Sequence, residues 1–332
     1  MKRTWLAGTV EDALEPELEI VDPHHHLWAE PIGTRYPRYD VEDLRVDTDA
    51  GHRVVETVFI DCAASYRTTG PEHLRPVGET AWVAERAAES ARTPGACIAA
   101  IVSHARLTLG EAVEEVLDAH VAAGNGLFRG IRDAGAWDAD ERIGRTHTNP
   151  APGMYGLASF RTGMGVLARM GLTFEAWQYH TQLGEVAALA RACPDVTIVL
   201  NHIGAPLGVG PYADRRDEVL AVWRPGLADV ATCPNVMLKV GGIGMSRYGV
   251  GFERWERPPT SDQLLAVWGD ELRWCIDTFG PERCMFESNF PVDAESCSYV
   301  VLWNAFKKVS IAYSPAERAA LFSGTARRVY RL

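Results

Sequence analysis

The sequence predicts an α/β fold, and within that class a (β/α)8 TIM barrel that forms a single domain over residues 1–332. Short apolar runs rich in β-branched residues alternate with longer segments of helical periodicity, a pattern typical of parallel sheets. Eight such runs are found, and dividing the 332 residues among them leaves about 41 for each strand, helix and pair of loops. With 47% hydrophobic residues, the chain can also bury one large core.

The predicted strands follow one another along the chain, separated by turns and helical segments. They cover Leu18–Asp22, Val54–Asp61, Ala96–Val102, Leu127–Arg132, Gly171–Trp177, Val196–His202, Asn235–Val240 and Arg283–Ser288. A weak internal repeat supports the alternation, because Cys193–Val196 and Cys233–Val236 both read Cys-Pro-Asx-Val and lie 40 residues apart. Proline cannot continue a helix, so both repeats mark a junction of helix and strand. One cladding helix is predicted over Leu109–Ala123, where apolar residues recur at three- and four-residue spacing.

Three predicted connections are too long and too rich in Gly and Pro to be simple turns: Glu30–His52, Ala134–Gly153 and Gly204–Tyr212. They follow the first, fourth and sixth predicted strands. They should therefore project from the C-terminal face of the barrel, where the active sites of barrel enzymes lie. We expect them to form the walls of a substrate pocket.

Composition excludes several classes of partner. The formal net charge of −11 and the lack of a Lys/Arg-rich run argue against nucleic acid. The seven cysteines form no C-x-x-C pair and are expected to be free thiols. The acidic N-terminal segment is not expected to act as a signal peptide, and no run of 18 apolar residues occurs. We expect a cytoplasmic protein that acts on a small molecule, without a membrane partner; a homo-oligomer is compatible with the sequence.

Histidines stand at the ends of two predicted strands. Alternate side chains of a strand share a face, so His24 and His26 should point together into the barrel mouth while His25 points away. His202 ends the sixth strand, across the barrel. Two or three imidazoles in one layer can bind a divalent ion, and we interpret His24, His26 and His202 as candidate metal ligands. A buried histidine that donates to a carbonyl is the alternative for His202.

Three motifs in this order resemble the amidohydrolase-related family, especially the branch that contains lactonases such as fuconolactonase and pyrone-dicarboxylate lactonase. They are D-x-H-x-H from Asp22, N-H-x-G from Asn201 and F-x-S-N-F-P from Phe286, with further similarity in Val58–Asp61, Phe128–Arg132 and Asn235–Lys239. The resemblance covers nearly the whole chain. It implies hydrolysis of a lactone or amide by a water activated at the barrel mouth. It also implies that His24 and His26 hold zinc or manganese in metal-dependent members.

The strand-eight motif departs from the family, because Asn289 stands where the resemblance implies an aspartate that serves as ligand or general base. An amide cannot accept a proton at neutral pH. Glu287, two residues earlier on the same face, is therefore the candidate base, although a buried carboxylate paired with an inward Arg or Lys is an equal alternative. Because Asn289 replaces an aspartate that serves as a metal ligand, catalysis without a metal is a further alternative. Asn289 itself remains a candidate catalytic residue.

Several further residues are candidates for contacts with the substrate or transition state. Arg132 can bind a carboxylate through its planar fork, unless it pairs with Asp61 or Asp133. Lys239 could stabilise an oxyanion, unless it pairs with Glu175 or Glu287. The remaining candidate substrate-binding residues are Asp61, Tyr66, Trp177, His180 and Gln182. His180 or Gln182 would occupy the place where metal-binding relatives carry a strand-five histidine. The Gly241–Gly244 run lacks the spacing of a nucleotide-binding loop.

Together these observations predict a hydrolase that opens a lactone or cyclic ester of a small substrate bearing a carboxylate. Two alternatives remain at this stage. One is a metal-dependent non-oxidative decarboxylase of an aromatic acid, which the wider family also contains. The other is a barrel that binds a small molecule but lost its base at Asn289 and is not catalytic.

Overall fold

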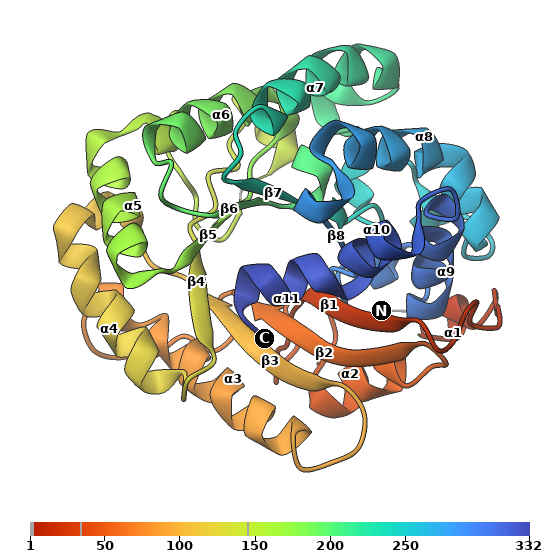
Figure 1. The fold of residues 1–332 in the computed structure, drawn as a ribbon, viewed down its shortest axis with the longest axis horizontal. Helices are drawn as coiled ribbons and strands as arrows, with labels where there is room; N and C mark the ends of the chain where they lie inside the picture. Colours follow the sequence, from red (N-terminus) through yellow and green to blue (C-terminus); the bar gives the residue numbers. More distant parts are fainter. Residues whose placement is uncertain (1–2, 34, 145) are drawn as a thin grey trace.

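In the computed structural model, eight parallel strands curve into a barrel that is surrounded by helices (Figure 1). The structure describes residues 3–33, 35–144 and 146–332. The strands are β1 (Glu19–His25), β2 (Arg53–Ile60), β3 (Cys97–Ser103), β4 (Phe128–Arg132), β5 (Thr173–Ala176), β6 (Ile198–Leu200), β7 (Val236–Gly241) and β8 (Cys284–Glu287). They pair in sequence order from β1 to β8. The predicted (β/α)8 fold is confirmed.

The barrel closes where the ends of β1 and β8 meet. The amide of Asn289 donates to the carbonyl of His24 at 2.9 Å, and the amide of His26 donates to the carbonyl of Phe290 at 2.8 Å. Behind them the buried Asp22 carboxylate accepts from the Ser288 amide at 3.0 Å. The backbone bonds that close the barrel therefore also hold the predicted histidine pair at its C-terminal mouth.

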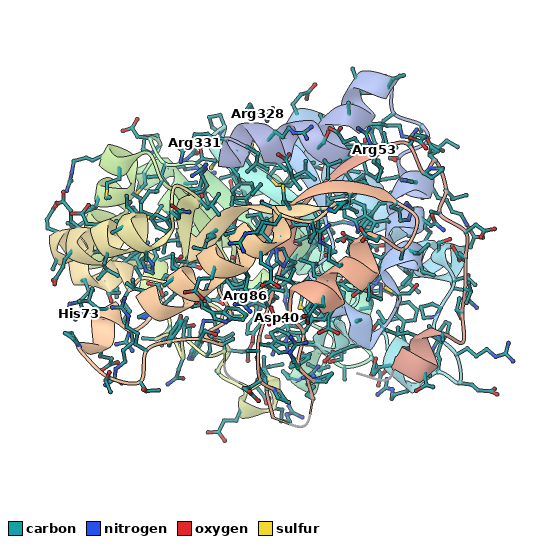
Figure 2. All side chains as sticks on the ribbon, turned by 90° about the horizontal axis from the view of Figure 1, so that it is seen from below. Asp40, Arg53, His73, Arg86, Arg328 and Arg331 are labelled. Atoms are coloured by element: carbon teal, nitrogen blue, oxygen red, sulfur yellow. The ribbon has the colours of Figure 1, made fainter. Side chains whose placement is uncertain are left out.

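Helices cover the outside of the barrel, with one at its base. They are α1 (Arg3–Leu6), α2 (Val41–Thr48), α3 (Val77–Ser90), α4 (Val113–Ala123), α5 (Ala158–Met170), α6 (Leu183–Ala192), α7 (Arg216–Ala231), α8 (Ser261–Phe279), α9 (Tyr299–Val309), α10 (Pro315–Ala319) and α11 (Thr325–Tyr330). Residues of α11 pack with apolar side chains of β1, β2, β3, β6 and β8. Arg327 of α11 pairs with Glu19 and Glu56 near the strand starts. This helix thus covers the N-terminal end, and Figure 2 shows Arg328 and Arg331 at the end opposite to His73.

Each predicted strand coincides with an observed one, but two boundaries are informative. β1 continues past Asp22 to His25, and its pairing with β2 shifts between Asp22 and His25. That irregularity accommodates Pro23, which cannot donate a ladder hydrogen bond. The helix predicted over Leu109–Ala123 begins only at Val113, because the residues before it form a 3₁₀ segment in which Gly110 has a φ of +62°.

The structure also bears on the expectations for the cysteines, for membrane-spanning helices and for the first long connection. All seven cysteines are free thiols, as predicted. Within the described ranges, no helix has the length and apolar character needed to cross a membrane. The long connection Glu30–His52 contains α2, which begins with a capping box at Asp40. The sequence analysis did not predict this helix.

Candidate active site

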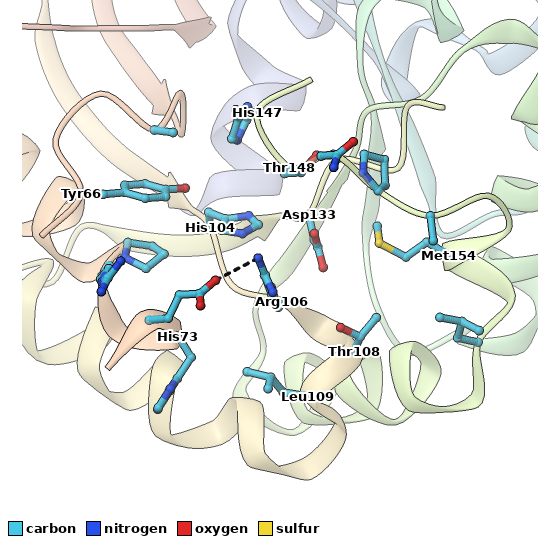
Figure 3. Close-up of a pocket in the computed structure, with 18 residues that line it drawn as sticks. Tyr66, His73, His104, Arg106, Thr108, Leu109, Asp133, His147, Thr148 and Met154 are labelled. Carbon is cyan, nitrogen blue, oxygen red and sulfur yellow. Dashed lines mark ion pairs between the residues drawn. The ribbon is translucent and has the colours of Figure 1, made fainter. Parts of the chain in front are cut away.

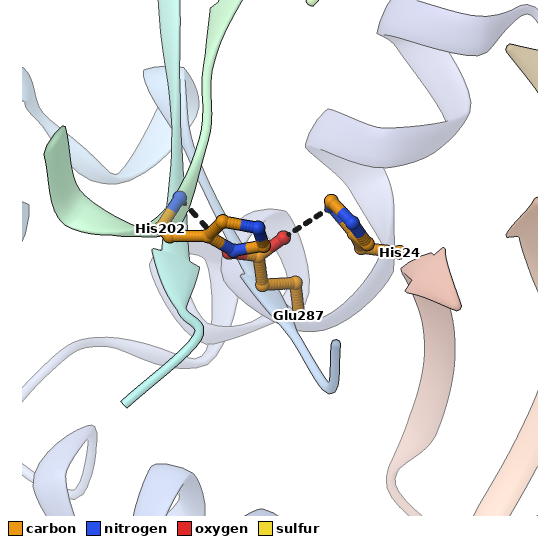
Figure 4. Close-up of side chains that lie close together, drawn as sticks. All are labelled: His24, His202 and Glu287. Atoms are coloured by element: carbon orange, nitrogen blue, oxygen red, sulfur yellow. Dashed lines mark hydrogen bonds and ion pairs between the residues drawn. The ribbon is translucent and has the colours of Figure 1, made fainter. Parts of the chain in front are cut away.

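Glu287, at the end of β8, lies between two histidines from opposite sides of the barrel mouth (Figure 4). Its Oε1 is 2.6 Å from Nδ1 of His202 and also accepts from the His202 amide at 3.1 Å. Its Oε2 is 2.8 Å from Nδ1 of His24. All three side chains are buried. The carboxylate partners are therefore imidazoles, not the Arg or Lys of the alternative reading.

His24 and His26 approach each other as the alternation of a strand predicts. Their Nε2 atoms are 3.2 Å apart. His26 donates from Nδ1 to the carbonyl of Ile60 at 2.7 Å, which leaves its Nε2 with a lone pair when the ring is neutral. His25 points elsewhere, and its Nε2 lies 3.1 Å from the hydroxyl of Thr57. The predicted orientation of the three histidines is confirmed.

Below the histidines lies a buried ion pair. Lys239 Nζ is 2.9 Å from Oε2 of Glu175 and 3.3 Å from Nδ1 of His24. Tyr330 of α11 donates a short hydrogen bond to the other Glu175 oxygen. Lys239 is fully buried and does not line the cavity above the histidines. The pairing of Lys239 with Glu175, named as the alternative to an oxyanion role, is the one observed.

Burial controls protonation in this cluster. It lowers the pKa of His24 well below its ordinary value, with Lys239 as the next cause, and it lowers the pKa of His202 similarly, with help from Arg132. Burial raises the pKa of Glu287 to about 8, although Lys239 opposes the shift. The histidines are therefore neutral near pH 7. The Glu287–His202 pair holds a proton that it can exchange close to neutral pH.

The donor set fits a divalent ion. Two nitrogens bound to one tetrahedral ion at about 2.0–2.1 Å lie roughly 3.3 Å apart, close to the 3.2 Å between Nε2 of His24 and Nε2 of His26. One ligand atom each from His24, His202 and Glu287 also lies within 4.8 Å of the others. Oε2 of Glu287 is buried and, among described residues, makes no hydrogen bond of good geometry. Arg132 Nη1, 3.4 Å from Nε2 of His24, weakens cation affinity by repulsion.

A small cavity of about 150 Å³ opens above the cluster. His26, Arg132, Trp177, His202 and Asn289 line this cavity. Arg132 donates to the backbone carbonyl of Asp61, and within the described part of the chain it forms no ion pair with a carboxylate. The Trp177 ring packs edge-on against the His202 ring, with centroids 4.9 Å apart.

The lining of this cavity also includes residues that the sequence analysis did not single out. Arg35 and Tyr36 come from the loop after β1, and Arg247 comes from the segment after β7. Arg35 pairs with Glu295, and Arg247 donates to the hydroxyl of Tyr179 at 2.5 Å. The Gly/Pro-rich Glu30–His52 connection was the available signal for Arg35 and Tyr36. Nothing in the sequence indicated Arg247.

The glycines after β7 let the backbone approach the cluster closely. A Cβ on Gly241 would lie 2.3 Å from the carbonyl oxygen of Glu287, and one on Gly242 would lie 2.6 Å from the ring of His202. Gly242 also has a φ of +67°. The glycines therefore allow the backbone to pack closely against Glu287 and His202. This role agrees with the rejection of a nucleotide-binding loop.

Asn289 lines the cavity, but its amide is already engaged. Its Nδ2 donates to Oδ1 of the buried Asp293 at 2.7 Å, and the Gly244 amide donates to the other Asp293 oxygen at 2.8 Å. Asn289 has a φ of +54°, uncommon for a residue other than glycine. A carboxylate is thus present one turn after the motif, behind the amide. Sequence reasoning did not identify Asp293.

The remaining predicted substrate contacts lie away from this cavity. Tyr66 lines a second cavity, and its hydroxyl donates at 2.6 Å to Asp61, which is fully buried. Gln182 binds loop backbone, donating to the Gly135 carbonyl at 2.8 Å and accepting from Trp137. His180 packs against Tyr212, with ring centroids 5.0 Å apart. A substrate contact for these four residues stays a prediction.

Comparison with known proteins identifies the family. A family model described as amidohydrolase matches residues 21–332. Protein y4mH of Sinorhizobium fredii, named as uncharacterised, is 32% identical over 336 aligned positions, covering 95% of this chain and 99% of that protein. An L-fucono-1,5-lactonase of Burkholderia multivorans is 29% identical over 255 positions, covering 76% of this chain and 77% of that enzyme.

The structural comparison agrees. A crystal structure of an amidohydrolase from Burkholderia multivorans with bound zinc superposes with a TM-score of 0.72 at 26% identity, covering 94% of this chain and 99% of that one. With the match over residues 21–332, this chain is an enzyme of the amidohydrolase family.

Proposed function

We propose that this enzyme hydrolyses a lactone or similar cyclic ester that carries a carboxylate. The observation that carries the proposal is the proximity of a proton-exchanging pair, Glu287 with His202, to the guanidinium of Arg132 at one small cavity. Ester hydrolysis needs both functions. The attacking water must lose a proton, and the carbonyl oxygen gains negative charge in the transition state.

In the proposed reaction, water attacks the lactone carbonyl carbon and the ring C–O bond breaks. His202 lines the cavity and takes the proton of the water, while Glu287, behind it, accepts the hydrogen bond from Nδ1 and balances the charge of the imidazolium. The proton then passes to the departing ring oxygen. The product is a hydroxy acid. Its ionisation near neutral pH releases one proton.

A divalent ion held by His24, His26 and their neighbours would lower the pKa of a bound water and polarise the carbonyl. The chain's own residues orient the substrate. The fork of Arg132 can bind a substrate carboxylate bidentately, and Trp177 offers an apolar wall. The volume of about 150 Å³ favours a small monocyclic substrate.

A panel of five- and six-membered lactones, read with a pH indicator, tests the proposal. We expect proton release with at least one member that carries a carboxylate. Glu287→Gln should keep the fold and lower turnover by about 10²- to 10⁴-fold, because His202, the base, loses the carboxylate that orients its ring and balances its charge. The matched control is Glu271→Gln, since Glu271 is also buried but pairs with Arg216 at 3.3 Å on the outer surface of the barrel. Full activity of Glu287→Gln would remove Glu287 from the mechanism.

Arg132→Lys tests the substrate contact. It keeps the positive charge but loses the bidentate fork, so we expect kcat/KM to fall far more than stability. Arg283→Lys serves as the control, because Arg283 donates to the backbone carbonyls of Phe279, Cys233 and Ala231, away from the cavity. It should lose stability and keep kcat/KM. If Arg132→Lys behaves in the same way, Arg132 is structural.

Two further measurements separate the alternatives. Release of carbon dioxide from aromatic acids, in place of proton release from lactones, would reassign the enzyme as a decarboxylase. Elemental analysis of protein purified without chelator measures whether a divalent metal is retained. Asn289→Asp should increase retention, because a carboxylate near His24 and His26 adds negative charge and an oxygen ligand.

A further inference from the structure

A second group of metal-ligating side chains lies beside a separate, larger cavity of about 670 Å³. Asp61 follows β2, His104 follows β3, and His147 stands in the loop after β4. One ligand atom from each lies within 4.8 Å of the other two. Figure 3 shows His104, His147 and the hydroxyl end of Tyr66 close together at one side of the cavity. We name Asp61, His104 and His147 the second cluster. None of them is needed for the lactonase mechanism proposed above.

The hydrogen bonds of the second cluster prepare its members as ligands. Asp61 is fully buried; one of its oxygens accepts from Tyr66 at 2.6 Å, and the other is 3.0 Å from Nε2 of His147. His104 donates from Nδ1 to the carbonyl of Arg132 at 2.9 Å. In the neutral ring this leaves Nε2 of His104 with a lone pair. Carbonyl-bonded imidazoles and hydrogen-bonded carboxylates are the usual surroundings of metal ligands.

The electrostatic surroundings also favour a cation. The buried carboxyl of Glu79 accepts from the amides of Ala64 at 2.7 Å and Cys62 at 3.4 Å. Within residues 3–33, 35–144 and 146–332, no Lys or Arg forms an ion pair with the carboxyl of Asp61 or of Glu79. Two buried acids next to each other are costly without a compensating charge.

We propose that Asp61, His104 and His147 bind a divalent transition-metal ion of the zinc class, with its remaining coordination positions open to the 670 Å³ cavity. Two imidazoles and one carboxylate are a donor set that suits zinc, cobalt or iron(II) and is too nitrogen-rich for magnesium or calcium. The 3.0 Å between Asp61 and His147 is near the separation expected for two ligands of one ion. This site is distinct from the donor set around His24 and Glu287.

An ion bound at the second cluster would connect a long loop to two strand ends at the barrel mouth. His147 belongs to the long Ala134–Gly153 connection, whereas Asp61 and His104 stand directly after the ends of β2 and β3. The ion would therefore fasten this connection to the ends of β2 and β3. Arg132 links the two sites, because its carbonyl binds His104 and its guanidinium binds the Asp61 carbonyl.

The experiment must separate the second cluster from the central donor set. Chelator-treated full-length protein is titrated with zinc in equilibrium dialysis, and with cobalt(II) while its visible absorption is recorded. A His24→Ala/His26→Ala variant removes the chelating pair at the barrel mouth. We expect this variant to bind one zinc per chain, and we expect the addition of His147→Ala to weaken that binding at least tenfold and abolish the cobalt spectrum.

His147→Ala is the decisive change, because its side chain is 31% exposed and its loss should leave the fold intact. His147→Gln serves as a second variant if the alanine protein is unstable. The matched control is His73→Ala, since His73 lines the same cavity but lies outside the second cluster and contacts Glu115. It should keep the zinc affinity of its parent. If the His24→Ala/His26→Ala protein binds no zinc, or binds it equally well after His147→Ala, the cluster is only an ion pair that tethers the loop.

Discussion

Gly242→Ala should separate the backbone cost of a positive φ from damage to the active site. Gly242 follows β7 with a φ of +67°, and a Cβ built there lies 2.6 Å from both Cγ and Nδ1 of His202. Ordinary contact begins at 3.4 Å, so the imidazole must retreat by about 0.8 Å. Nδ1 is among the displaced atoms of His202, and it lies 2.6 Å from Oε1 of Glu287. The change therefore stretches the very contact on which the proposed proton transfer depends.

Two costs are expected. Alanine in the left-handed region loses about 1–2 kcal/mol of unfolding free energy, and overpacking adds about 1–3 kcal/mol. A displacement near 1 Å in a catalytic group can lower turnover by about 10²-fold. Gly126→Ala is the matched control, because Gly126 has a φ of +80° with nothing within 4 Å of a built Cβ, and it lies between α4 and the start of β4. It should lose only the backbone part of the stability and none of the activity.

The assay combines urea unfolding with kcat/KM on the lactone identified in the panel, for both variants and the parent. Equal kcat/KM for Gly242→Ala and Gly126→Ala would refute the prediction, since His202 would then tolerate displacement from Glu287. The prediction is also refuted if Gly242→Ala loses no more stability than Gly126→Ala, because the predicted collision would not exist.

Two predictions concern groups away from the cavity. Tyr330→Phe removes the hydroxyl that donates to Glu175, so unfolding in urea should show a loss of about 1.5–3 kcal/mol, with a fall in kcat/KM that a purely structural tyrosine would not cause. His52 has its pKa lowered to about 4 by burial, then by Lys307, so the neutral ring contributes stability above about pH 6.5 that is lost as pH falls through about 4. His52→Gln can keep the contacts to Lys307 and the Val300 carbonyl while removing the titration, and its unfolding free energy should fall less steeply between pH 6.5 and 4, by up to about 1.4 kcal/mol per pH unit. An equal slope in the two proteins would count against His52.

Local patterns were sufficient to predict the barrel and the approximate positions of its strands. Strand alternation and the position of Pro23-His24-His25-His26 placed two histidines on one face, because that inference needs only a period of two. Arg132 and Trp177 were likewise predicted from their places at strand ends, and both line the cavity. The position of a residue at a strand end does not predict which neighbouring side chains it contacts. Glu287 was predicted as a base, but its contacts with two histidines depend on the closure of the barrel.

Loop residues were harder to assign than strand residues, for a physical reason. Tyr66 follows the end of β2 by only a few residues, yet it lines the second cavity and not the first, because the chain turns after β2 toward Glu79. Arg247 comes to the first cavity only through the turn of glycines after β7. Such turns depend on positive φ values and on contacts made across the fold. Neither is encoded in a window of a few residues.

The interior of the barrel carries polar contacts from its base to its mouth, and this continuity explains why a fully buried lysine is tolerated. From the base, Tyr330 donates to Glu175, Glu175 pairs with Lys239, and Lys239 lies 3.3 Å from His24. His24 in turn is 2.8 Å from Glu287. A buried charge is costly unless every neighbour compensates it, so removal of one member should leave the next without a partner. We therefore expect α11 to influence the chemistry through Glu175 and Lys239, although it lies at the opposite end of the barrel from the cavity.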